Sequence, residues 1–100
     1  MGARSEVRTV RQPWPVVYDA LLRCLPAAGF EITDTDPDRG HIRLETRNTR
    51  LTVAVGAVDA ITSEWVATSE LKVGLLRDRH EEKFAAIGDA LDRYLATYYG

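Results

Sequence analysis

Apolar residues recur at every third or fourth position along the last fifth of the chain, which is the spacing of one face of an α-helix. Charged residues fall mainly between them, on the other side of the same helix. Asp78 and Glu81 have the spacing of a helix cap in which two residues satisfy each other's backbone groups. The pattern therefore predicts a long C-terminal helix whose apolar stripe contains Phe84, Ile87, Gly88, Leu91, Tyr94, Leu95 and Tyr98.

Between residues 30 and 73 the apolar positions change to every second residue, as in strands that are buried on one side. Four strands are predicted, separated by turn-forming residues at 34–40, at Asn48-Thr49 and around Asp59–Ser63. The opposite faces are mainly polar, so the pattern favours an antiparallel sheet covered on one face. That covered face is predicted to contain Phe30, Ile32, Ile42, Leu44, Leu51, Val53, Val55, Ala57, Trp65, Ala67, Ser69, Leu71 and Val73.

The N-terminal segment predicts one more strand and a short helix. Residues 6–11 have strand-forming composition, but their valines break strict alternation, which indicates a bulge or an edge strand. Pro15 suits the first turn of a helix, and apolar residues follow it at helical spacing. Pro26 is expected to kink this helix or to end it near residue 25, with Gly29 closing the segment.

Length and charge exclude several classes of protein. One hundred residues provide for a single domain over residues 1–100, of which 1–5 are expected to be flexible. There are 13 Lys and Arg against 15 Asp and Glu, and the isoelectric point near 5.6 argues against nucleic-acid and membrane-surface partners. The single cysteine excludes an internal disulfide and a cysteine-based zinc site. The first residues lack the apolar stretch of a secretory signal, so a cytoplasmic location is expected.

The predicted order is strand, helix, four strands, helix, which gives the α+β class. We expect one antiparallel sheet of about five strands, with the short N-terminal helix and the long C-terminal helix packed on one face. This order resembles the helix-grip and TATA-binding-protein-like domains, in which a long final helix lies across a curved sheet. The resemblance implies the strand order 1-5-4-3-2, with the first and second strands at the edges.

Three segments are also similar to the BamC-like domains, which are helix-grip modules of a bacterial outer-membrane assembly lipoprotein. They are Val17–Leu22, Gly29–Asp36 and Gly40–Ile42, and the resemblance spans about 30 residues. It implies the fold and, for function, protein–protein binding. A role in outer-membrane assembly is not expected, because the lipid-acceptor cysteine and the tandem second domain of that family have no counterpart in this sequence.

One acidic pattern resembles a calcium-binding loop. Asp34, Asp36, Asp38 and Glu45 have the spacing of the first, third, fifth and twelfth ligands. However, Arg39 stands where the loop needs glycine, and the flanking segments are predicted strands rather than helices. A hairpin turn rich in aspartate is the simpler interpretation, so no metal and no cofactor are expected.

A basic cluster is the second candidate for binding. Arg43 and Arg47 share a strand face, and their spacing suits phosphates or an acidic protein surface. Glu45 between them, with glutamates on neighbouring strands, favours a solvated face of mixed charge. Tyr99 falls outside the apolar stripe of the last helix and is therefore available to a partner. The candidate partner-binding residues are Arg39, Arg43, Arg47, Arg50 and Tyr99.

Catalytic motifs are absent from the sequence. Cys24 lies on the apolar stripe of the first helix and is expected to be a buried, inert thiol. His41 and His80 have no partner nearby in the sequence and are expected at the surface. No nucleophile elbow, phosphate loop or dinucleotide fingerprint occurs, so an enzyme is not expected.

Two functions follow from this reasoning. The first is a non-catalytic module that binds another protein or a second copy of itself, through a sheet face or an exposed strand edge. The alternative is a small carrier of an apolar ligand between the sheet and the C-terminal helix. A cavity of about 300 Å³ or more would favour the carrier. Against it, several apolar residues are expected to fill that space: Phe30, Ile42, Leu44, Trp65, Leu71, Phe84, Ile87 and Leu91.

Overall fold

The computed structural model describes residues 4–47, 49–71 and 80–99. Its elements follow the predicted order, five strands and two helices. The bounds are β1 (Arg4–Val10), α1 (Trp14–Ala27), β2 (Glu31–Asp36), β3 (His41–Glu45), β4 (Thr49–Asp59), β5 (Thr62–Leu71) and α2 (His80–Tyr98). The expectations for Asn48, Val73 and the cap at Asp78 lie outside the described residues.

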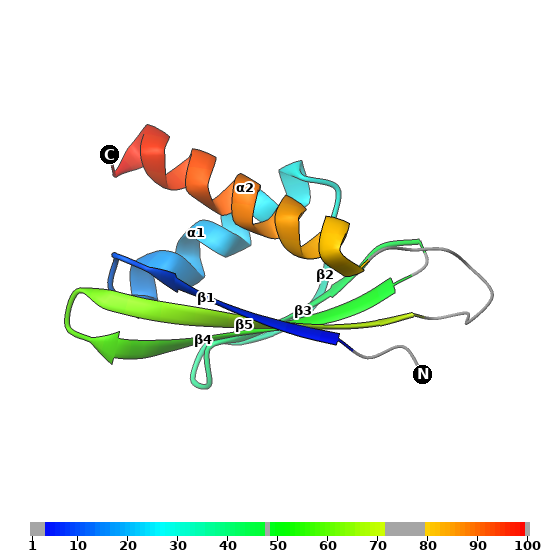
Figure 1. Ribbon diagram of the computed structural model, residues 1–100, viewed down its shortest axis with the longest axis horizontal. Coiled ribbons are helices and arrows are strands. Elements are labelled where there is room, and N and C mark those ends of the chain that lie inside the picture. The colour runs from blue at the N-terminus through cyan, green and yellow to red at the C-terminus, as the bar shows by residue number, and fades with distance from the viewer. Residues whose placement is uncertain (1–3, 48, 72–79, 100) are drawn as a thin grey trace.

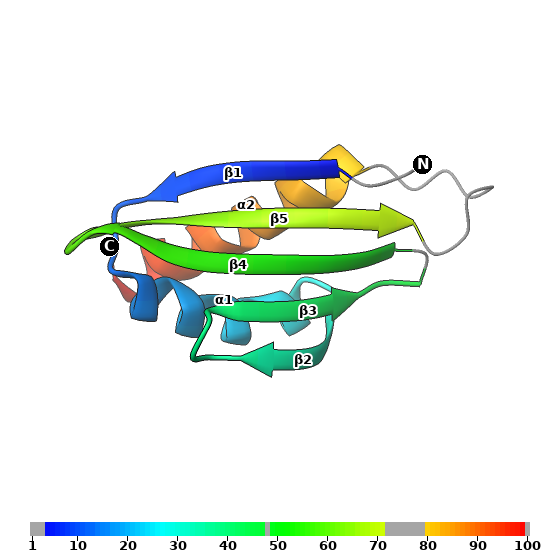
Figure 2. The same ribbon diagram turned by 90° about the horizontal axis from the view of Figure 1, so that it is seen from below.

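The five strands form one antiparallel sheet in the order β1-β5-β4-β3-β2, which confirms the expected topology. Figure 2 shows β1 and β2 at the two edges and both helices behind the sheet. Among the described residues, no element covers the other face of the sheet, which is called the open face below.

Alternation along the strands separates the two faces as predicted. Ile42 and Leu44 are buried on the helix side, whereas Arg43 between them is exposed. Trp65 is 1% exposed and lies opposite Val55 on the neighbouring strand. These side chains join those of both helices in one hydrophobic cluster, so the core lies between the sheet and the helix layer.

Several strand boundaries differ from the sequence prediction. β1 begins at Arg4 rather than residue 6, because Arg4 and Ser5 pair with Ser69 and Thr68 of β5. β2 continues through Asp36, after a bulge between Ile32 and Asp34, and only residues 37–40 turn. Backbone pairing with β3 outweighs the turn preference of the aspartates. β5 begins at Thr62, inside the segment expected to turn.

The tip of the β4–β5 hairpin also differs. Ala57, expected on the covered face, is exposed. The hairpin extends past the helices at this end of the sheet (Figure 2). Val58 and Ile61 at the tip are therefore 54% and 67% exposed.

Both helices lie on one face of the sheet, and α2 packs mainly against α1 (Figure 1). α1 includes Pro26 in its last turn and ends at Ala27, two residues beyond the predicted end. Gly29, at φ +96°, then reverses the chain into β2. Within the described residues, no helix is both long and apolar enough to cross a membrane.

The apolar stripe of α2 is buried at Phe84, Ile87, Leu91 and Leu95. Tyr98 was expected on the same buried stripe, but its side chain is 66% exposed. Figure 1 shows the reason, because the C-terminal end of α2 rises away from the sheet above α1. The prediction for Tyr98 was therefore wrong.

Candidate functional site

The residues predicted to bind a partner do not form one surface. Arg43 on β3 and Arg50 on the adjacent β4 line the same shallow groove on the open face. Arg39 is in the β2–β3 turn, and Arg47 is exposed in the β3–β4 connection. Tyr99 follows the last turn of α2 and is 47% exposed. Of these five residues, only Arg43 and Arg50 line a common groove.

The open-face groove has a volume of about 370 Å³. Glu45 and Glu70 line it beside the two arginines, together with three threonines. Two carboxylates therefore balance two guanidinium groups, and the groove has no net charge. This balance favours a solvated face of mixed charge over a site that grips phosphate.

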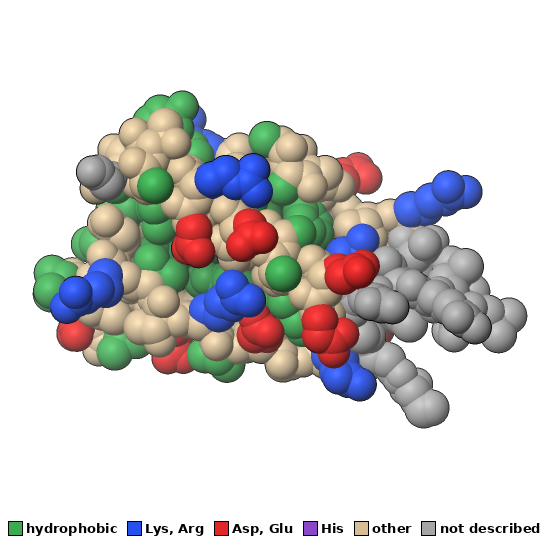
Figure 3. Space-filling model, turned by 45° about the horizontal axis from the view of Figure 1, so that its top comes forward, with side chains coloured by type: hydrophobic (Ala, Val, Ile, Leu, Met, Phe, Trp, Pro, Cys, Tyr) green, Lys and Arg blue, Asp and Glu red, His purple; other side chains and the backbone are tan. Residues whose placement is uncertain are grey.

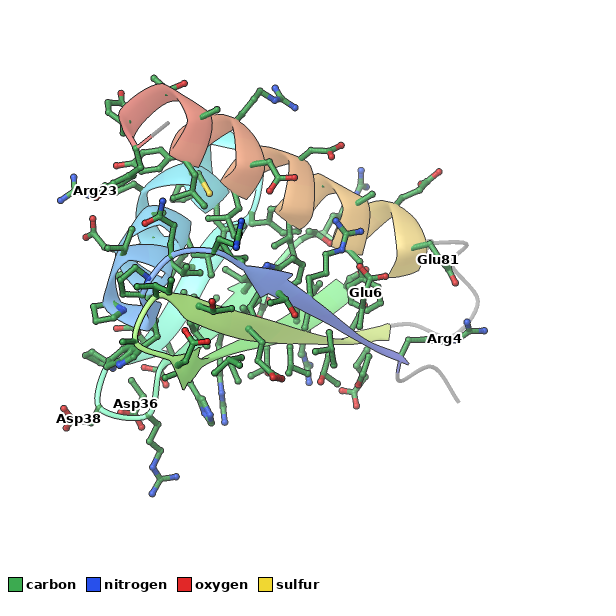
Figure 4. The ribbon with its side chains drawn as sticks, turned by 60° about the vertical axis from the view of Figure 1, so that its left-hand side comes forward. Arg4, Glu6, Arg23, Asp36, Asp38 and Glu81 are labelled. Carbon is green, nitrogen blue, oxygen red and sulfur yellow. The ribbon has the colours of Figure 1, made fainter. Side chains whose placement is uncertain are left out.

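The acidic residues of the calcium-like pattern are spread along a hairpin. Asp34 and Asp36 belong to β2, Asp38 is in the turn, and Glu45 is at the far end of β3. Asp36 and Asp38 lie at the β2–β3 turn (Figure 4), whereas Glu45 lies at the opposite end of this hairpin. Asp36 is 3.8 Å from the guanidinium of Arg39. Among the described residues, no three His, Cys, Asp or Glu side chains are close enough to hold a metal ion.

A larger groove of about 720 Å³ lies between the C-terminal half of α1 and α2, and we call it the α1–α2 groove. Small side chains line much of it, which keeps the two helices from filling the space between them. The residues that define its apolar part are Ala27, Ala28, Ala86, Ala90, Tyr94 and Tyr98.

Two aromatic rings border the α1–α2 groove. The ring centroids of Tyr94 and Tyr98 are 4.5 Å apart, with an angle of 38° between the ring planes. Tyr94 is half-buried, whereas Tyr98 presents most of its side chain to solvent. The pair therefore offers an exposed aromatic surface next to the alanines, suitable for contact with a flat apolar molecule.

Charged side chains also line the α1–α2 groove. Arg23 donates a hydrogen bond of 3.0 Å to Asp19, and this bond raises the pKa of Arg23 above its ordinary value. Figure 4 shows Arg23 pointing outward from α1 near the C-terminal end of α2. Asp89 and Arg93 line the groove from α2. Arg93 makes no ion pair with any residue that the structure describes, so its charge is available to a ligand.

Cys24 also lines this groove and is 7% exposed. Burial raises the pKa of its thiol from 9.0 to about 11, and the Sγ–H group points to the carbonyl oxygen of Leu21 at 3.9 Å. A thiol of this pKa is protonated at neutral pH and is a poor nucleophile. The structure thus places Cys24 where the sequence predicted, in a buried position.

A charged pair on the helix side of β1 was missed by the sequence reasoning. Glu6 and Arg8 are half-buried and form an ion pair of 2.5 Å between Oε2 and Nε. Arg8 lies over the ring of Trp65, with 5.8 Å between its Cζ and the ring centroid. A Cβ at Gly88 of α2 would overlap the guanidinium of Arg8, so glycine leaves room for it. The signal available in the sequence was that charged residues occupy alternate positions of this strand, whereas the apolar Val7 lies on its other face.

Figure 3 shows the same region from outside. Acidic and basic side chains stand among apolar atoms across the face that includes α2 and β1. Arg4 and Glu81 add an exposed ion pair of 3.2 Å between the start of β1 and the start of α2 (Figure 4). Exposed pairs of this kind contribute little to stability.

No protein-family model and no curated protein sequence matches this chain. Solved structures do resemble it. Protein CV1439 from Chromobacterium violaceum superimposes with a TM-score of 0.57 at 14% identity, over 96% of each chain. The Zhui aromatase/cyclase from Streptomyces sp. R1128 gives 0.56 at 15% identity, over 95% of this chain and 84% of its own. A START superfamily protein from Mycobacterium smegmatis gives 0.51 at 9% identity, over 97% and 93%.

These likenesses concern the fold alone, because the identities are low. They support a helix-grip architecture and do not single out the BamC-like or TATA-binding-protein-like domains that the sequence resembled. The chain therefore has a helix-grip fold, with a five-stranded antiparallel sheet, an N-terminal helix and a long C-terminal helix.

Proposed function

We propose that this protein binds a small, mainly apolar ligand in the α1–α2 groove. The observation that carries this proposal is a volume of about 720 Å³ bordered by alanines and by an exposed tyrosine pair. Ligand sites in proteins are usually concave, mainly apolar and about 300–1,000 Å³ in volume. The groove falls within this range of volume, and alanine and tyrosine side chains outnumber the charged ones in its lining.

The position of the groove modifies the carrier hypothesis drawn from the sequence. That hypothesis put the ligand between the sheet and the C-terminal helix. In this chain the space is taken by α1, whose residues Val17, Leu21 and Leu25 are fully buried. The ligand site of our proposal therefore lies one layer further out, between the two helices.

The chemistry of the lining suggests the class of ligand. Tyr94 and Tyr98 offer ring faces to a flat molecule. Arg93, which makes no ion pair with any described residue, offers a positive charge at the same groove. A ligand with an aromatic or alicyclic body and one anionic group would use both. We propose binding without catalysis, because the one thiol in the groove is held protonated by burial.

A fluorescence titration tests the proposal. The probe is 8-anilinonaphthalene-1-sulfonate, which has an aromatic body and a sulfonate. We expect saturable binding to the wild-type protein, and at least about tenfold weaker binding to Ala90→Leu, which fills the groove. Ala85→Leu is the matched control, because Ala85 is exposed on α2 and does not line the groove.

Circular dichroism would verify that both variants keep the wild-type fold. Binding lost in Ala90→Leu and retained in Ala85→Leu would support the proposal. Absence of saturable binding to the wild type, or equal binding to all three proteins, would overturn it.

Protein binding, the other hypothesis from the sequence, stays a prediction. The resemblance to BamC-like domains implied it, and the arginines proposed for it do not share a surface. The exposed edge strand β1 is the part of the fold that supports it best.

A further inference from the structure

The two edges of the sheet differ in how open they are to pairing. β2 contains a bulge after Ile32 and three acidic residues, Glu31, Asp34 and Asp36. Bulges and like charges are the devices that protect an edge from pairing with another chain. β1 is regular over seven residues, has no proline, and pairs with β5 without a register shift.

The residues of β1 alternate between two different faces. Glu6, Arg8 and Val10 lie half-buried on the helix side, whereas Ser5, Val7 and Thr9 are exposed on the open face. Val7 is the middle residue of the strand and is 57% exposed, one of the largest exposures among the described apolar side chains.

We propose that two copies of this chain associate through β1, edge to edge and antiparallel, with Val7 of one copy opposite Val7 of the other. In this register Glu6 lies opposite Arg8 of the second copy, and Arg8 lies opposite Glu6 of the second copy. Ser5 meets Thr9 on the open face. Each of these is a favourable cross-strand combination: two opposite-charge pairs, one apolar pair and two hydroxyl pairs.

Other registers lack this complementarity. A shift by two residues in one direction places Glu6 opposite Glu6 and Arg4 opposite Arg8, and in the other direction it places Arg8 opposite Arg8. Like charges directly opposite each other destabilise a strand pair. A shift by one residue reverses the second sheet, so that its helices lie on the opposite side.

The proposed pairing joins two five-stranded sheets into one continuous sheet with all helices on the same side. It also gives partners to the backbone groups along the outer edge of β1. The contact is short, so we expect association to depend on concentration, as in weak interfaces of small area. This proposal is independent of the ligand site, since no residue of β1 lines the α1–α2 groove.

Cysteine cross-linking tests the register of the two β1 strands directly. Residues opposite each other in an antiparallel pair have Cα atoms about 4.5 or 5.5 Å apart, within the range that a disulfide spans. Under mild oxidation we expect Val7→Cys to form a covalent dimer with itself. Thr9→Cys is the matched control, because it faces Ser5 of the second copy and not itself. A mixture of Thr9→Cys with Ser5→Cys should form the mixed dimer.

Cys24 is buried, so the wild-type chain should not form a covalent dimer in this experiment. The predicted result is a dimer band for Val7→Cys and for the mixture only. Failure of Val7→Cys to couple, or equal coupling of Thr9→Cys alone, would overturn the proposed register.

Charge exchange gives a second readout that needs no cysteine. In Glu6→Arg the two cross-strand pairs become Arg opposite Arg, and we expect the dimer dissociation constant to rise about tenfold. The double variant Glu6→Arg with Arg8→Glu restores opposite charges and should recover most of the affinity. Sedimentation velocity over a range of concentrations measures both, with the fold verified by circular dichroism. A wild type that stays monomeric at every concentration, or a double variant as weak as the single one, would contradict the proposal.

Discussion

At the scale of single residues, burial sets the chemistry of Cys24. Its side chain is 7% exposed, and desolvation raises the pKa of the thiol from 9.0 to about 11. The folded protein therefore keeps this proton in a pH range where the unfolded chain loses it. Stability from this group is complete below about pH 9 and is lost as the pH rises through about 11.

We therefore expect the free energy of unfolding to fall more steeply between pH 9 and 11 in the wild type than in Cys24→Ala. Urea denaturation at a series of pH values measures the difference between the two proteins. Tyrosine and lysine titrations contribute equally to both and cancel in that difference. Parallel pH profiles would show that the thiol titrates normally in the folded protein.

At the scale of elements, two glycines with positive φ follow α1 and end the β2–β3 turn, respectively. They differ in the space that a Cβ atom would have. Gly40, at φ +72°, ends the β2–β3 turn, and a Cβ there would overlap the carbonyl oxygen of Val55. Both backbone groups of Gly40 are hydrogen-bonded: its N–H donates to the carbonyl oxygen of Pro37 at 3.3 Å, and its oxygen accepts a bond of 2.8 Å from the N–H of Val55. Gly29, at φ +96°, has open space around the same position.

Alanine at these two sites should therefore have unequal effects. Gly29→Ala adds only backbone strain, and we expect it to cost about 1–2 kcal/mol of unfolding free energy. Gly40→Ala adds a clash with backbone to that strain, so we expect a loss of more than about 3 kcal/mol. Thermal and urea unfolding of both variants give the comparison, and equal losses would contradict the role of the Val55 carbonyl.

Strand alternation and helical spacing were sufficient to predict the element order from the sequence. Ile42, Leu44 and Trp65 are buried as their spacing indicated, because each strand has one covered face. The boundaries that failed depend on partners distant in sequence. Asp36 belongs to a strand because β3 is there to pair with it, and Tyr98 is exposed because α2 rises from the sheet.

The candidate site was less predictable than the fold, for the same reason. The α1–α2 groove is formed by alanines on two helices about 60 positions apart, and alanine is common on any helix. Its depth depends on the crossing of α1 and α2, which periodicity within either helix does not determine. The charged alternation of β1 was visible in the sequence, but its meaning depended on which strand edge remained unpaired.

At the scale of the whole molecule, α1 fills the space between the sheet and α2. Leu21 is fully buried in the middle of this layer, between the sheet and α2. Its truncation should open an apolar cavity there, because close-packed surroundings relax only partly around a lost side chain. The molecule would then have an interior site as well as the groove between its helices.

Leu21→Ala is therefore expected to lower the free energy of unfolding by about 3–5 kcal/mol. A domain of ordinary stability remains folded after such a loss, and benzene, which is small enough for the new cavity, should raise its melting temperature. Leu22→Ala removes the same atoms from a half-buried position of α1 and serves as the control, with a smaller loss and no effect of benzene. Differential scanning calorimetry with and without benzene makes the comparison. If benzene stabilised neither variant, the packed layer would have collapsed into the vacated space, and the fold would hold a ligand only between its helices.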